Sequence, residues 1–398
     1  MPHSPEPDED VLDAVAPPHP VFHVEQALLG AFLLEPQRLN EVTGIGPDAF
    51  STASHAALFA AISSLPAPDP AEHAAHPQWL DAVLAVAREQ ARGLTAAYLH
   101  SLIQVCPWPP HAPAYARMIE AEQCRRRLAA AAQHLIQSAR DTSLPQRVAS
   151  TLDEADVLGC VVDDIAARFP PHAGSLPRTP TPPQATTHDQ DALDEERLLL
   201  ATATAHPNSV GQMRWLTPGD FTHPVHAGLW LCLTTLIRRD TPVDPVTVLW
   251  EAQHRGLLGA GAEPRELLKL LAGPVGTPEH WGERILHRSV LAAAHHLGRR
   301  IETFTNDPAN TPYQLVVGSR RALADLTAVR TRWQHATTEP APTTRPARTR
   351  PATSTATPRA GPPPNTPPPP TLRRRTPPPP APGSAMPTPT ATPPGSPG

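Results

Sequence analysis

Histidine has the most versatile chemistry of the residues in this sequence, and some of the 20 histidines lie close together: His73 and His76, His223 and His226, His295 and His296. A zinc site needs three or four converging ligands, usually in a string such as His-Glu-x-x-His, and no such string occurs. His55 and His226 each lie one turn before an apolar stripe, a position typical of a packed, hydrogen-bonded histidine. We therefore expect no metal site.

Other catalytic groups are equally poorly placed for a reaction. The paired carboxylates Asp163-Asp164 and Glu195-Glu196 are expected at helix ends, where their charge complements the helix dipole. No Gly-x-Ser-x-Gly string is present to hold a serine nucleophile. The one lysine, Lys269, lies in the apolar run Leu267–Leu271, whereas a phosphate-binding loop needs a Gly-Lys-Ser/Thr step. The sequence therefore predicts no catalytic residue and no cofactor.

Three consecutive arginines, Arg125, Arg126 and Arg127, form the densest basic cluster in the helical part of the chain. They could be a solvated helix face that pairs with Glu120 and Glu122, or a docking surface for an acidic partner or for DNA phosphates. A second cluster, Arg373–Arg375, lies between proline runs, where it would bind nucleic acid only weakly. These runs could also bind a proline-recognising domain or act as a spacer. We expect any contact with DNA to be weak or indirect.

Composition indicates two helical blocks with proline-rich chain around them. Of the 55 prolines, 22 lie in residues 337–398, which also carry seven arginines against one glutamate. Because the net charge of the whole chain is −5, the remaining chain is acidic and a poor phosphate clamp. The four cysteines show no Cys-x-x-Cys spacing, the first residues do not resemble a signal peptide, and no apolar run reaches membrane-spanning length. A reduced, cytoplasmic protein without a membrane span is expected.

Helical periodicity predicts an all-α fold of two small globules, each ending in a long helical hairpin. The hairpin helices are expected at 114–140 and 144–169 in the first block, and at 277–304 and 311–333 in the second. The predicted organisation is an acidic disordered N-terminus (1–20), a first domain (21–169), a flexible proline-rich linker (170–191), a second domain (192–333) and a disordered Pro/Thr/Arg-rich tail (334–398).

The two blocks are copies of one another. A constant shift of 171 residues superposes 25–65 on 196–236 without a gap, and we count ten identities in the 41 positions. The shared residues include prolines, a phenylalanine and a histidine in one register, which amphipathic periodicity alone does not produce. We conclude that the sequence contains a tandem duplication.

These residues carry a resemblance to the N-terminal domain of the DnaB-type replicative DNA helicase. The first block has the run Glu25–Gly30 and later Tyr98-Leu99 and Tyr115-Ala116, and the second has Asp-Pro-Val-Thr-Val at 244–248. The first block lacks this Asp-Pro-Val-Thr step, and in the second Ala201 replaces Gly30. The positions that match the family pattern, all expected to be structural, are Glu25, Leu28, Leu29, Phe50, His55, Phe59, Glu196, Leu199, Leu200, Phe221, His226, Trp230, Asp244, Pro245 and Thr247.

In that family the domain forms a ring collar through paired hairpins, receives primase, and precedes an ATPase motor. The resemblance therefore implies a non-catalytic replication scaffold that binds a replicative helicase, a primase or its own copies. Two alternatives remain: a helicase or a collar subunit whose ATPase is on another chain, and an interaction protein unrelated to replication. Since the chain has two hairpins, we also expect them to pair with each other, as an intramolecular pseudo-dimer, in competition with a homo-oligomer.

Overall fold

The computed structural model describes residues 19–76, 78–182, 189–259, 263–273 and 276–337, and within these ranges all regular secondary structure is helical. The predicted all-α fold is confirmed. Within the same ranges, no helix combines the length and the apolar content that a membrane span requires. The disordered N-terminus predicted at 1–20 and the tail predicted at 334–398 lie outside the described residues, apart from the few residues that belong to the first and last helices.

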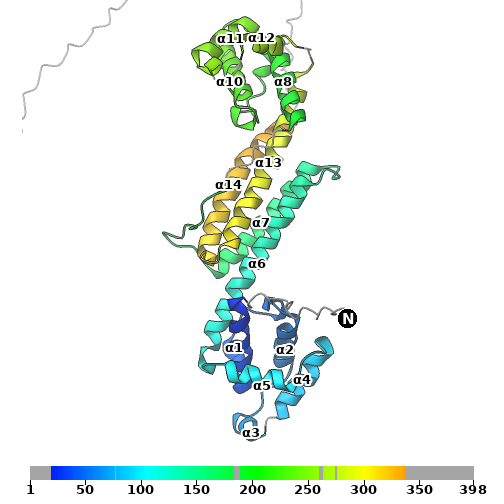
Figure 1. The fold of residues 1–398 in the computed structure, drawn as a ribbon, viewed down its shortest axis with the longest axis vertical. Helices are drawn as coiled ribbons and strands as arrows, with labels where there is room; N and C mark the ends of the chain where they lie inside the picture. Colours follow the sequence, from blue (N-terminus) through cyan, green and yellow to red (C-terminus); the bar gives the residue numbers. More distant parts are fainter. Residues whose placement is uncertain (1–18, 77, 183–188, 260–262, 274–275, 338–398) are drawn as a thin grey trace, which may run out of the picture. The chain divides into compact units, whose positions relative to one another are not determined.

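The first globule is a set of short helices that surround α1. Phe32, Leu28 and Leu29 of α1 are fully buried, and the core is completed by Leu58 and Phe59 of α2. Phe50, in the turn before α2, stacks on Phe59 with ring centroids 5.0 Å apart. The elements, at the blue and cyan end of the sequence in Figure 1, are α1 (Pro20–Leu34), η1 (Pro36–Glu41), η2 (Pro47–Ala49), α2 (Ala53–Ser64), α3 (Pro70–Ala75), α4 (Gln78–Gln90), α5 (Ala96–Val105) and η3 (Pro109–His111).

The second globule repeats this plan around α8. Leu199 and Leu200 of α8 are fully buried, and Trp230 of α10 packs on Phe221 as Phe59 packs on Phe50. The elements, drawn in green in Figure 1, are α8 (Gln190–Ala205), α9 (Pro207–Val210), η4 (Pro218–Asp220), α10 (Pro224–Arg238), α11 (Pro245–His254), η5 (Leu257–Gly259) and α12 (Pro264–Leu271).

Local sequence explains where many of these helices begin. Proline, whose fixed φ suits a first helical turn, is near the start of α1, α3, α10, α11, α12 and α13. Asp244 accepts hydrogen bonds from Val246 N (2.7 Å) and Thr247 N (2.9 Å), and the Thr247 hydroxyl accepts one from Asp244 N, so the two residues cap α11 reciprocally. The first globule has its own Asp-Pro step in α3, where Asp69 caps the backbone N–H of Ala71 and Glu72. Both steps are therefore structural.

Four long helices follow the globules, two from each half of the chain, and Figure 1 shows them side by side. Their bounds lie within a few residues of the predicted ones: α6 (Ala112–Arg140), α7 (Arg147–Arg168), α13 (Pro278–Asn306) and α14 (Pro312–Thr337). One apolar core runs through all four and includes Leu128, Leu158, Leu297 and Leu326. The intramolecular pairing of the two hairpins that the sequence predicts is therefore present.

The pairing has the symmetry of a two-fold dimer. Ala132 and Gly298 each stand 20 residues after the first residue of their helix, α6 and α13, and they meet. A Cβ added to Gly298 would lie 3.0 Å from the Ala132 carbonyl oxygen and 2.6 Å from Ile136 Cγ1. Equivalent positions that contact each other are the mark of an isologous interface, here built between two parts of one chain.

Part of the predicted linker, around residues 176–178, packs on the α13–α14 hairpin. Arg178 N donates to Asn310 Oδ1 (3.0 Å), and Gln314 Nε2 donates to the Leu176 carbonyl oxygen (2.8 Å). Pro177 packs so closely on Gly318 that a Cβ there would lie 2.6 Å from the proline ring. Residues 176–178 are therefore held against the turn between α13 and α14 and the start of α14, and this part of the linker is not a flexible chain.

Candidate functional site

A buried carboxylate–imidazole pair joins the first two helices of the first globule. Glu25 of α1 and His55 of α2 are both fully buried, and His55 Nδ1 lies 2.6 Å from Glu25 Oε2. Ser51 holds the same carboxylate, donating its backbone N–H to Oε1 (2.6 Å) and its hydroxyl to Oε2 (2.9 Å). Because a carboxylate accepts hydrogen bonds, it orients an Nδ1–H of the imidazole toward itself, and in the neutral ring Nε2 is then a hydrogen-bond acceptor.

Tyr98 of α5 completes this network. Its hydroxyl oxygen lies 2.7 Å from His55 Nε2, so it donates the hydrogen bond that the neutral ring accepts. Burial raises the pKa of the Tyr98 phenol, which keeps it protonated as a donor. Phe22 covers the imidazole with its ring centroid 4.8 Å away. In the first globule the histidine is therefore closed off, and its role is to hold α1, α2 and α5 together.

The second globule repeats the carboxylate–imidazole pair at the same spacing. Glu196 is fully buried, and its Oε2 lies 2.7 Å from His226 Nδ1. Thr222 N donates to Glu196 Oε1 (2.5 Å), in the position that Ser51 N has in the first copy, and His223 N donates to Oε2 (3.3 Å). Both histidines are buried and hydrogen-bonded.

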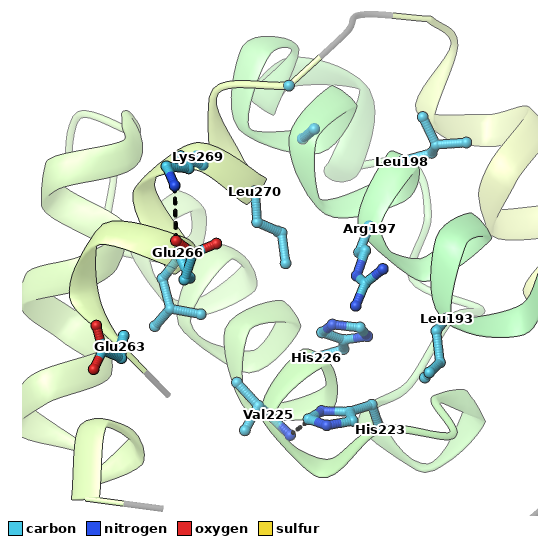
Figure 2. A pocket seen from close by; sticks show the side chains of 13 residues that line it. Leu193, Arg197, Leu198, His223, Val225, His226, Glu263, Glu266, Lys269 and Leu270 are labelled. Carbon is cyan, nitrogen blue, oxygen red and sulfur yellow. Dashed lines mark hydrogen bonds and ion pairs between the residues drawn. The ribbon is translucent and has the colours of Figure 1, made fainter. Parts of the chain in front are cut away.

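The outer nitrogen of the second histidine is in a different environment. Across the described residues, no hydrogen-bond partner is found for His226 Nε2, and the ring lies at the wall of a cavity of about 710 Å³. Figure 2 shows Arg197, His226 and Leu270 around this opening. The cavity lies between α8, the start of α10 and α12, and it is lined by Leu193, Arg197, Leu198, Ala201, His223, Val225, His226, Glu263, Glu266, Leu267, Lys269, Leu270 and Gly273.

The replacement of Gly30 by Ala201 accounts for part of this difference. At Gly30 the backbone of α5 touches α1, because an added Cβ would lie 2.2 Å from the Leu102 carbonyl oxygen. In the second copy the Ala201 methyl group lies in the corresponding place and faces Gly273, 3.4 Å from where a Cβ on that glycine would be. The close backbone contact of the first globule is therefore impossible between α8 and α12.

The three arginines of α6 make their contacts within the chain. Arg125 donates to the carbonyl oxygens of Thr305 and Asp307 (2.9 Å each) and Asn310 (2.5 Å), so it caps the end of α13 across the hairpin pairing. It also pairs with Glu122 at 3.3 Å, and its side chain is only 16% exposed.

The next two arginines anchor other parts of the first half. Arg126 donates to the carbonyl oxygens of Ala49 and Phe50, and Arg127 pairs with Asp164 at 2.8 Å. Neither contact was visible in the sequence, because the partners are tens of residues away. These contacts account for the cluster without an external acidic partner.

The other charged residues that the sequence analysis singled out in the described ranges also have partners within the chain. Lys269, with its side chain 74% exposed, pairs with Glu266 on α12 at 2.8 Å and is not part of a glycine-rich loop. Asp163 pairs with Arg320 at 2.9 Å, while Glu195 receives Arg284 and Arg288. In the described ranges, no group of three or more His, Cys, Asp or Glu side chains is arranged to hold a metal ion.

Comparison with known proteins agrees with the duplicated architecture. The family model described as "DnaB-like helicase N terminal domain" matches residues 16–121 and 188–282, which together make up half of the chain. Both matches cover a globule and end within the first turns of the following long helix, so most of each hairpin lies outside them. No curated protein and no solved structure matches the chain. The chain belongs to the family of DnaB-like helicase N-terminal domains, which it contains twice.

Proposed function

We propose that this protein is a non-catalytic adaptor of DNA replication that binds a replicative helicase, a primase or both through its two collar-type domains. The observation that carries the proposal is the double match to the helicase N-terminal domain in one chain whose two hairpins already pair with each other. Because the family match covers only this N-terminal domain, binding rather than unwinding is the function we propose for it.

The use of the hairpins inside the chain leaves the globules as the surfaces for partners. Large apolar side chains are exposed there: Val246 (66%) and Trp250 (62%) lie one turn apart on α11, and Trp108 (58%) precedes α6. Exposed tryptophan is enriched among the residues that dominate binding energy at protein interfaces. These side chains are therefore the first candidates for a docking surface.

The test is binding of the full chain to the helicase and the primase of the same organism. We expect co-elution with at least one of them in size-exclusion chromatography at tens of micromolar, and weaker binding for Trp250→Ala or Trp108→Ala. Val157→Ala is the matched control, because Val157 is 55% exposed but lies on α7 of the bundle. Failure to bind either protein contradicts the proposal.

An ATPase assay separates the adaptor from a helicase. The pure chain should show no DNA-stimulated turnover, since Lys269 is surface-exposed and ion-paired on a helix. Turnover that Lys269→Ala abolishes would instead establish a motor.

A further inference from the structure

The cavity of the second globule combines an apolar wall with one hydrogen-bond acceptor. Leu193, Leu198 and Leu270 supply apolar surface. In its neutral form His226 presents Nε2 with a lone pair, because Glu196 accepts the hydrogen bond from Nδ1. Of the charged side chains at the opening, Lys269 pairs with Glu266 at 2.8 Å and Arg197 with Asp194 at 2.9 Å, while Glu263 also lines the cavity. An apolar body with one donating polar tip is the chemistry that fits such a wall.

The first globule shows which group meets this acceptor in the other copy of the fold. There the phenol of Tyr98 donates to His55 Nε2 at 2.7 Å, and the ring of Phe22 covers the imidazole. At the position of Phe22 the second copy has Leu193, a smaller side chain that lines the cavity. The carboxylate, the imidazole and their geometry are retained in the second copy, while the phenol is not.

We propose that this cavity binds a tyrosine side chain of a partner protein, whose hydroxyl donates a hydrogen bond to His226 Nε2. The phenol takes the role that Tyr98 has in the first globule, and its ring lies against the leucines of α8 and α12. The site thereby gives the second globule a binding specificity that the first globule lacks.

The tyrosine has to come from another protein. The chain has three tyrosines, and the rings of all three pack within it: Tyr98 on His55, Tyr115 on His111 and Tyr313 on Phe169. Residues 1–18 and 338–398 contain no aromatic residue that could reach back into the cavity. The terminal segments of this chain therefore contain no phenol, and in a second copy each tyrosine ring already packs on its own chain.

Covalent catalysis by the Glu196–His226 pair is less well supported by the same cavity. In such catalysis the general base acts on a nearby hydroxyl or thiol of the protein. The residues that line the cavity include no serine, threonine, cysteine or tyrosine. The pair is arranged to accept a hydrogen bond from a ligand, and this is the property to be tested.

The probes are p-cresol, which is the tyrosine side chain, and toluene, which has the same ring without the hydroxyl. They are titrated into the full chain with isotope-labelled histidines, and the ring nitrogens are followed by NMR. We expect p-cresol to shift Nε2 of His226 saturably and toluene to bind at least tenfold more weakly, because only the phenol satisfies the acceptor. Equal binding of both probes, or no shift at His226 up to the solubility limit of p-cresol, overturns the proposal.

Two variants distinguish a loss of p-cresol binding from a loss of folding. Leu270→Trp fills the cavity without removing the Glu196–His226 pair, and it should abolish the p-cresol shift while helicity is unchanged. Tyr98→Ala should create a second p-cresol site, seen as a new saturable shift at His55. A p-cresol shift that persists in Leu270→Trp, or a Tyr98→Ala chain that gains no site, contradicts the proposal.

This inference does not depend on replication. If the chain binds helicase or primase and p-cresol does not shift His226, the adaptor function stands and the tyrosine site is wrong. If p-cresol binds as described and neither replication protein does, the tyrosine site stands and the adaptor function is wrong.

Discussion

At the scale of single residues, the buried carboxylates Glu25 and Glu196 have the same function in the two globules. Each carboxylate accepts a hydrogen bond from a backbone N–H in the turn before α2 or α10. Each also binds the histidine in the first turn of that helix, His55 or His226. A buried carboxylate is costly unless its oxygens are hydrogen-bonded, and here both oxygens are. The pair therefore sets the angle at which α2 meets α1 and α10 meets α8.

Replacement of Glu25 by glutamine should destabilise the first globule by about 2 kcal/mol, since the charge-assisted hydrogen bonds to His55 and Ser51 are lost while the volume is kept. Hydrogen exchange of the amides of α1 and α2 measures the local free energy of opening. Glu196→Gln is the matched control and should act on α8 and α10 alone. A change below about 0.5 kcal/mol in the affected globule would show that the carboxylate is not needed.

At the scale of elements, α13 packs against each of the other three bundle helices and carries the histidines His287, His295 and His296. Burial lowers the pKa of His287, His295 and His296, and for His295 the positive charges of Arg140 and Arg299 lower it further. The neutral imidazole is therefore the form that the folded bundle prefers. The other charged or titratable groups around these rings are Glu283 and Arg284 for His287, His296 and Glu302 for His295, and Arg300 and Asp325 for His296.

The bundle should become less stable as the pH falls below about 6.5, the ordinary histidine pKa. In that range the unfolded chain takes up protons that the folded chain resists, so acid favours unfolding until the lower folded pKa is reached. Urea denaturation at pH 7.5 and 5.5 measures this as a lower midpoint in acid. The variant with glutamine at all three positions should lose most of the difference. An equal difference in that variant would place the acid sensitivity elsewhere.

The packing of α13 on α6 depends on Gly298 for a steric reason. Alanine at this position would put a methyl group 3.0 Å from a backbone carbonyl oxygen of α6 and 2.6 Å from Ile136, so the helices would have to separate. We expect Gly298→Ala to destabilise the bundle by about 1–3 kcal/mol in urea denaturation. Gly159→Ala on α7 is the control, because a Cβ there meets no atom within 4 Å. That variant should be stabilised by up to about 1 kcal/mol through helix propensity, and stabilisation of both variants would disprove the close crossing.

At the scale of the whole molecule, the two hairpins, α6–α7 and α13–α14, pack together as an internal dimer. Charged pairs cross between the hairpins along α7 and α14: Arg320 meets Asp163 at 2.9 Å, and Arg330 donates to Asp156 at 2.9 Å. The Arg330 guanidinium lowers the pKa of Asp156 by its hydrogen bonds and charge. Exposed pairs of this kind add little energy, so the shared apolar core supplies most of the stability and the charges fix the register.

Crosslinks between the hairpins should therefore form within one chain. A double variant with cysteines at positions 156 and 330, and with the exposed Cys160 replaced by serine, is treated with a short dithiol crosslinker. When isotopically light and heavy chains are mixed before the reaction, we expect no light–heavy crosslinked peptides, because both ends come from the same molecule. Light–heavy peptides at the statistical proportion would mean that the hairpins pair between chains.

Much of the fold can be predicted from the sequence because it depends on local interactions. The long helices α6, α7, α13 and α14 begin and end within a few residues of the periodic patterns, and the proline and aspartate at 244–245 mark the start of α11. The shared register of the two blocks also places Glu196 and His226 in the roles of Glu25 and His55. The sequence did not show that residues 176–179 bind the α13–α14 turn, since nothing local distinguishes a bound proline-rich segment from a free one.

By itself, then, the sequence determined the all-α class, the duplication and the family, since helix periodicity, capping and repeat spacing are encoded among near neighbours in the chain. Only the tertiary structure decided what the individual chemical groups do. Arg125 looks like part of a basic surface until its acceptors are found about 180 residues away, at the end of α13. From the sequence, His226 matches His55. In the structure it lacks the counterpart of the Tyr98 phenol, and its ring lies at the wall of a cavity. Such roles depend on which surfaces meet, and that is decided by side-chain volumes in three dimensions, down to the single methyl group that distinguishes Ala201 from Gly30.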